Sequence, residues 1–121
     1  MPVEKILIVD DSPSDRQFLL EKLSKRGYEC VTAESGAEAI SKSKTELPDL
    51  ILMDVIMPGT NGYEATRTIT RDEATRDIPV ILCTGKGQET DRLWGLRQGA
   101  RDYVTKPIDV NDLLEKIAAC G

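Results

Sequence analysis

Apolar residues occur along this chain in short continuous runs rather than in alternation with polar residues. The strongest runs are residues 6–9, 50–53 and 80–83, and weaker runs are residues 30–33 and 103–104. A strand with apolar side chains on both sides is covered on both faces, which is typical of a parallel sheet. The pattern therefore predicts five strands in the interior of the protein.

Helical stretches separate these runs, and their ends carry recognisable signals. Four expected helices begin after a side chain that can cap the first turn: Ser12, Ser35, Asn61 and Asp109. Two expected helices are followed by a glycine, Gly27 or Gly99, as is common at helix ends. Strict alternation of five strands with five helices predicts one doubly wound α/β domain, covering residues 1–121, with right-handed crossovers.

Polar side chains follow four of the five expected strands. Asp10 and Asp11 come after the first run, Asp54 after the third, Thr84 after the fourth and Lys106 after the fifth. Ligands of open parallel sheets bind at the carboxyl ends of the strands. We therefore expect these five side chains to form one site.

The chemistry of this set favours a divalent cation and phosphoryl transfer. Two carboxylates 4 Å apart repel each other by about 4 kcal/mol at an effective dielectric constant near 20, and a bound cation would relieve this repulsion. The chain has no histidine, so oxygen ligands favour Mg²⁺, or Mn²⁺, over zinc. An aspartate beside such a cation can accept a phosphoryl group whose oxygens pair with a lysine and a threonine.

Composition excludes several other classes of protein. The chain is 40% hydrophobic and 31% charged with a net charge of -5, which argues against direct nucleic-acid binding. Its three cysteines have no metal-binding spacing and are expected to be reduced thiols. No apolar run approaches the roughly 18 residues that a membrane span needs. We expect a cytoplasmic protein without membrane insertion.

Four segments resemble the receiver domains of bacterial two-component response regulators, the CheY-like family. They are "LIVDDSPSDR", "DLILMDVIMPGTNGYE", "PVILCTG" and "GARDYVTKP", and their order and spacing match over essentially the whole chain. The resemblance implies a flavodoxin-like (βα)5 fold with strand order 2-1-3-4-5 and helices on both faces. It also implies Mg²⁺ as cofactor and a histidine kinase or phosphotransfer domain as phosphoryl donor.

The resemblance implies a role for each residue around the metal. Asp54 matches the phosphoacceptor, Asp11 the acid that binds the metal directly, and Asp10 the acid that acts mainly through a water molecule. Ile56 matches the position whose backbone carbonyl completes the metal shell. Haloacid-dehalogenase-like phosphohydrolases place a second acid at the position of Ile56, so an enzyme acting on an external substrate is not expected.

The remaining matched positions concern the phosphoryl group and its readout. Thr84 matches the switch hydroxyl, Lys106 the lysine that pairs with the phosphoryl group, and Tyr103 the switch aromatic. Pro107 matches a proline that usually follows a cis peptide bond in this family. The downstream target is expected to bind the face formed by the fourth helix, fifth strand and fifth helix.

Lys86 and Trp94 both follow the fourth expected strand, and the sequence leaves two interpretations for each. Lys86 occupies a position that tunes hydrolysis of the phospho-aspartate in this family, and its long cation could shield the phosphoryl group or have no effect. Trp94 is either a half-buried aromatic or part of a partner-binding face, since tryptophan is favoured in interface anchors.

A finer resemblance concerns the segment "QETDRLWGLRQGARDYVTKP". It is similar to the stand-alone receivers of type IV pilus (twitching-motility) systems, the PilH group. The sequence ends just after the fifth expected helix without a basic helix-turn-helix, so we expect a single-domain switch that controls pilus motility or chemotaxis. The alternative, a receiver fragment of a DNA-binding transcriptional regulator, remains open.

Overall fold

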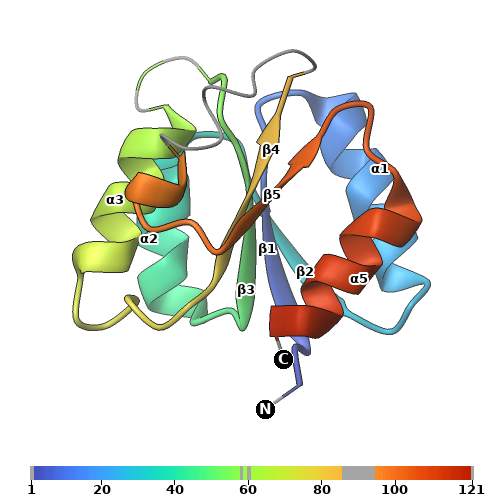
Figure 1. Ribbon diagram of the computed structural model, residues 1–121, viewed down its shortest axis with the longest axis horizontal. Coiled ribbons are helices and arrows are strands. Elements are labelled where there is room, and N and C mark those ends of the chain that lie inside the picture. The colour runs from blue at the N-terminus through green and yellow to red at the C-terminus, as the bar shows by residue number, and fades with distance from the viewer. Residues whose placement is uncertain (1, 58, 60, 86–94, 121) are drawn as a thin grey trace.

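The computed structural model describes residues 2–57, 59, 61–85 and 95–120. Five parallel strands form one sheet between two layers of helices (Figure 1). The strands are β1 (Lys5–Val9), β2 (Glu29–Ala33), β3 (Leu50–Asp54), β4 (Val80–Thr84) and β5 (Asp102–Thr105). Their order, β2-β1-β3-β4-β5, confirms the expected fold class.

The helices lie on both faces of the sheet, α1 and α5 on one face and α2 and α3 on the other (Figure 1). Their bounds are α1 (Pro13–Ser24), α2 (Gly36–Glu46), α3 (Gly62–Arg71) and α5 (Val110–Cys120). Residues 95–97 are also helical. The rest of the expected fourth helix, with Trp94, lies outside the described residues, and so does Lys86.

Successive residues of each strand pack into different cores. On β1, Ile6 and Ile8 belong to the core beneath α1 and α5, whereas Leu7 and Val9 belong to the core beneath α2 and α3. All four side chains are at most 2% exposed. Because both faces are covered, the strands lack polar alternation, as the sequence pattern indicated.

All four predicted helix caps are confirmed. The capping oxygens of Ser12, Ser35, Asn61 and Asp109 each accept a backbone N–H of the following first turn. At the start of α2, the Glu38 side chain also makes a capping contact. Its carboxylate accepts the N–H of Glu34, at 2.7 Å, whereas in the usual capping box it would accept the N–H of the capping residue, Ser35. Gly27 and Gly99 follow helical segments with φ of 92° and 106°, which confirms them as stop signals.

Helix α2 ends at a residue that the sequence did not mark. Leu47 is in the left-handed conformation, with φ 45° and ψ 60°, and 59% of it is exposed. A side chain with a Cβ atom is strained in this conformation, where glycine is not. Little apolar burial offsets the strain, since most of Leu47 faces solvent.

The cysteine side chains agree with the sequence expectation. The three cysteines are free thiols. Burial raises the pKa of the Cys83 thiol to about 12, which leaves it a core side chain. Within the described ranges, none of the helices has the length and apolar character needed to cross a bilayer.

Replacing Leu47 with glycine is expected to stabilise the protein. Relief of the left-handed strain, less the greater freedom of glycine in the unfolded chain, should raise the free energy of unfolding by about 0.5–1 kcal/mol. The matched control is Gly27→Ala, where an added Cβ meets no atom within 4 Å but the φ of 92° is unchanged. Urea unfolding should show the control destabilised by a similar amount, and a destabilised Leu47→Gly variant would contradict this interpretation.

Candidate functional site

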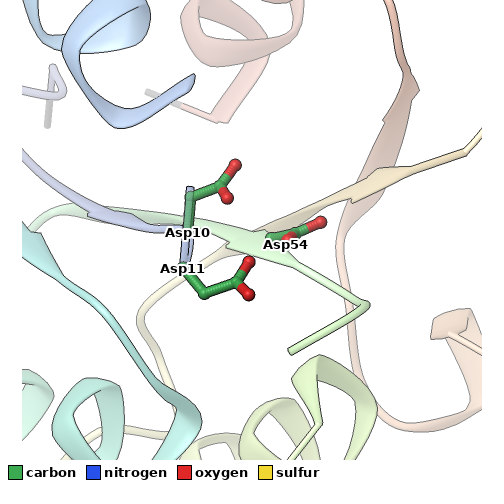
Figure 2. Close-up of side chains that lie close together, drawn as sticks. All are labelled: Asp10, Asp11 and Asp54. Carbon is green, nitrogen blue, oxygen red and sulfur yellow. The ribbon is translucent and has the colours of Figure 1, made fainter. Parts of the chain in front are cut away.

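Three carboxylates meet at the carboxyl end of the sheet. Asp10 and Asp11 directly follow β1, and Asp54 is the last residue of the neighbouring strand β3. Each offers an oxygen within 4.8 Å of the other two (Figure 2). Asp10 is 2% exposed and Asp54 6% exposed, while Asp11 is open to solvent.

Lys106 is the cation that the fold places among these acids. Its Nζ lies 3.1 Å from Oδ2 of Asp10 and 3.3 Å from Oδ1 of Asp54. A third carboxylate, that of Asp15 on α1, lies 3.3 Å away. The backbone N–H of Lys106 donates to the carbonyl of Thr84, at 2.7 Å, which ties the loop after β5 to the end of β4. The structure therefore brings the predicted acids and lysine together.

The site favours the charged form of Lys106 but disfavours that of Asp54. Burial raises the pKa of Asp54 to about 6, with a further contribution from the negative charge of Asp10, and Lys106 only partly offsets these effects. Burial would lower the pKa of Lys106, but Asp54 and Asp10 outweigh it and the pKa is raised. Lys106 is therefore an ammonium at neutral pH, whereas the charge on Asp54 has an energetic cost.

The turn after β1 is held by contacts that the sequence did not indicate. Oδ1 of Asp10 accepts the N–H of Ser12 at 2.9 Å, and its other carboxylate oxygen faces Lys106. The carbonyl of Asp10 accepts a bond from the Arg16 guanidinium at 2.8 Å, and the same guanidinium pairs with Glu34 at 3.1 Å. Arg16 thus orients the peptide between Asp10 and Asp11.

Thr84 and Tyr103 lie on the neighbouring strands β4 and β5. The buried Thr84 hydroxyl donates to the carbonyl of Val104 at 3.4 Å, a long hydrogen bond. Tyr103 is half-buried against the core beneath α2 and α3. Lys116 of α5 donates to the Tyr103 carbonyl at 2.7 Å and lies 5.1 Å from the centre of its ring. Tyr103 was expected as the switch residue, but no motif in the sequence indicated its contact with Lys116.

The loop after β3 approaches the acids closely. A Cβ on Gly62 would lie 2.2 Å from the carbonyl oxygen of Asp54, so only glycine allows α3 to begin here. The N–H of Gly62 donates to the Val55 carbonyl at 3.2 Å. In the same loop, the Ile56 side chain is 65% exposed. In the loop after β5, the peptide bond between Lys106 and Pro107 is cis. A glycine at the start of a capped helix was the available signal for Gly62.

A hollow of about 250 Å³ adjoins Lys106 on the side of α1. It is lined by Asp15, Phe18, Leu19, Lys106, Pro107 and Ile108. Phe18 is 41% exposed, so an aromatic surface borders the charged site.

The comparisons with known proteins agree with this fold and site. Residues 6–118 match the response regulator receiver domain family. The chain therefore belongs to this family. It is 51% identical over 115 residues to protein PilH of Pseudomonas aeruginosa, an alignment covering 95% of each protein.

Longer regulators and solved receivers are also similar. The phosphate regulon transcriptional regulatory protein PhoB of P. aeruginosa is 44% identical over 94% of this chain, which spans only 50% of PhoB. The structure of the Vibrio cholerae chemotaxis protein CheY4 superposes with a TM-score of 0.91 at 30% identity, covering 98% of this chain and 99% of that one. The receiver domain of the sensor histidine kinase PA1611 from P. aeruginosa, solved with a magnesium ion coordinated in its active-site cleft, gives a TM-score of 0.87 at 31% identity, covering 95% and 94%.

The raised pKa of Asp54 predicts a dependence of stability on pH. A carboxyl group whose pKa is raised by folding contributes stability below its unfolded pKa near 4, and this stability is lost as pH rises through about 6. In metal-free buffer at pH 7.5, Asp54→Asn should therefore unfold with a free energy about 1–3 kcal/mol higher than the wild type. The gain should vanish near pH 4, as measured by urea unfolding across pH.

The matched control is Asp72→Asn. The N–H of Ala74 and the ammonium of Lys44 lower the pKa of Asp72, so removing its charge should decrease stability at pH 7.5. An Asp54→Asn variant that is no more stable than the wild type at pH 7.5 would contradict the repulsion described for this site.

Proposed function

We propose that this protein is a stand-alone signalling switch controlled by phosphorylation of Asp54. The carrying observation is the Lys106 ammonium, 3.3 Å from the Asp54 carboxylate within a cluster of acids. Membership of the receiver family supports the assignment. The phosphoryl donor is the phosphohistidine of a histidine kinase or phosphotransfer domain.

The residues at the site fit a divalent cation. Three carboxylates with oxygens within 4.8 Å of one another are hard ligands, and Mg²⁺ suits them, with Mn²⁺ as a substitute. Both carboxylate oxygens of Asp10 already have protein partners, so Asp11 and Asp54 would bind the metal directly and Asp10 would act through a water molecule. The backbone carbonyl of Ile56 would supply a further ligand. When bound, the cation neutralises the acids and the incoming phosphoryl oxygens.

The protein residues supply the remainder of the reaction. An oxygen of the Asp54 carboxylate attacks the phosphorus atom and forms an O–P bond. The N–P bond of the phosphohistidine breaks, and its electron pair stays on the imidazole nitrogen. Lys106 pairs with one phosphoryl oxygen and the Thr84 hydroxyl donates to another. Attack by water on the same phosphorus breaks the O–P bond to Asp54, releases inorganic phosphate and returns Asp54 to its free carboxylate. The reaction that we propose is thus confined to the protein's own Asp54.

The switch begins with the Thr84 hydroxyl. Its bond to the Val104 carbonyl is long, at 3.4 Å, and a charged phosphoryl oxygen is a stronger acceptor. As Thr84 moves toward the phosphoryl group, it opens space for Tyr103 to turn inward. The surface formed by β5, α5 and the expected fourth helix then binds its downstream target differently, as a two-state population shift.

The relatives support a cellular setting. Similarity to PilH over 95% of both proteins favours a cytoplasmic regulator of type IV pilus motility or chemotaxis. The alternative is the receiver part of a DNA-binding transcriptional regulator, because the chain also aligns with half of PhoB. The higher identity to PilH, 51% against 44%, favours the first role. An immunoblot of the native protein distinguishes the two roles by size.

Asp54→Asn should abolish phosphorylation. The wild type should gain one phosphoryl group when incubated with acetyl phosphate and Mg²⁺, as measured by intact-protein mass spectrometry. The amide of the variant is a poor nucleophile, so its labelling should fall to background. Asp72→Asn, which removes the same charge away from the site, should label normally. Undiminished labelling of Asp54→Asn would refute the assignment.

Substitution of the two adjacent acids should separate their roles. Asp11→Ala removes a direct ligand and should weaken Mg²⁺ binding about tenfold more than Asp10→Ala, which corresponds to about 1.4 kcal/mol. Isothermal titration calorimetry measures both affinities. The reverse order would show that Asp10 is the direct ligand.

A further inference from the structure

The Asp15 carboxylate contacts the site from outside the acid cluster. Its Oδ2 lies 3.3 Å from Nζ of Lys106, the same distance as Oδ1 of Asp54. The two acids differ in environment, since the Asp15 side chain is 51% exposed and that of Asp54 8% exposed. Asp15 is thus a solvent-facing partner of the lysine that the proposed reaction uses.

The ammonium of Lys106 is fully engaged in this state. It has three N–H donors and three carboxylates within reach, at 3.1, 3.3 and 3.3 Å. A phosphoryl oxygen can pair with Lys106 only if one of these contacts is given up. The contact to Asp15 is the easiest to release, because water can replace the ammonium at an exposed carboxylate but not at a buried one.

The position of Asp15 on α1 directs its carboxylate toward the site. Its N–H donates to the capping hydroxyl of Ser12 at 3.4 Å, which holds the backbone in the first turn. The carboxylate then spans from α1 to the loop after β5, along the hollow that it lines together with Lys106. A helix dipole alone would favour an acid here, but it does not account for the contact with Lys106.

We propose that Asp15 is a positioning residue that holds Lys106 at the entrance of the site and competes with the phosphoryl group for it. This inference rests on the proposed function of Asp54 as phosphoacceptor. It has a consequence that depends on the sign of the ligand's charge. Removing the Asp15 charge should strengthen binding of an anion at the site, while binding of a cation should stay the same or weaken.

The experiment uses beryllofluoride, an anionic analogue of the phosphoryl group. At saturating Mg²⁺, Asp15→Asn should bind it about two- to fivefold more tightly than the wild type, the range expected for an exposed ion pair. In separate calorimetric titrations, the affinity for Mg²⁺ alone should be unchanged or lower. The gain for beryllofluoride should shrink at about 1 M salt, where exposed charges are screened.

Three further variants control the result. Asp15→Glu retains the charge and should behave like the wild type. Asp15→Ser is too short to reach Lys106 and should reproduce the effect of Asp15→Asn. Asp72→Asn removes an equal charge from a lysine-paired aspartate elsewhere, and its beryllofluoride affinity should not change.

Each other outcome overturns the proposal. Equal beryllofluoride affinity of Asp15→Asn and the wild type would show that Asp15 does not compete for Lys106. Loss of affinity for both beryllofluoride and Mg²⁺ would indicate a purely structural role. An equal gain in Asp72→Asn would show an effect of net charge. If the wild type itself failed to bind beryllofluoride with Mg²⁺, the proposed function would fail together with this inference.

Discussion

One ammonium group stabilises the acidic end of the sheet. Burial of β1 and β3 places Asp10 and Asp54 where water cannot screen their charges, and the two carboxylates raise each other's energy. Lys106 pairs with both, at 3.1 and 3.3 Å, and its backbone is tied to the end of β4. The ends of four strands thus meet around the Lys106 ammonium. The repulsion that remains is what makes this edge ready to take up further positive charge.

The fold was predictable because its signals are local. Continuous apolar runs such as residues 6–9 identify strands covered on both faces, and the oxygens of Ser12 and Ser35 mark helix starts within a few residues. The end of α2 was not predictable, because Leu47 adopts a conformation that the chain usually reserves for glycine. The strand order came from family resemblance, since alternation alone does not determine which strands are neighbours.

The sequence predicted the site residues that lie at the ends of strands, but not those that reach the site from a helix. Asp10, Asp54 and Lys106 converge because the carboxyl ends of parallel strands meet at one edge. Asp15 and Arg16 could not be assigned, because the reach of a helical side chain depends on how α1 packs against the sheet. Those contacts are set by tertiary structure, so no short motif records them.

The alternation of side chains along each strand separates the protein into two cores with no shared buried residue among those described. The backbone of the sheet is therefore the main connection between these two cores. On β5, Tyr103 packs against one core and its neighbour Val104 belongs to the other. A displacement of β5 would consequently move side chains in both cores at once. A local change at this edge of the sheet would therefore reach both layers of helices.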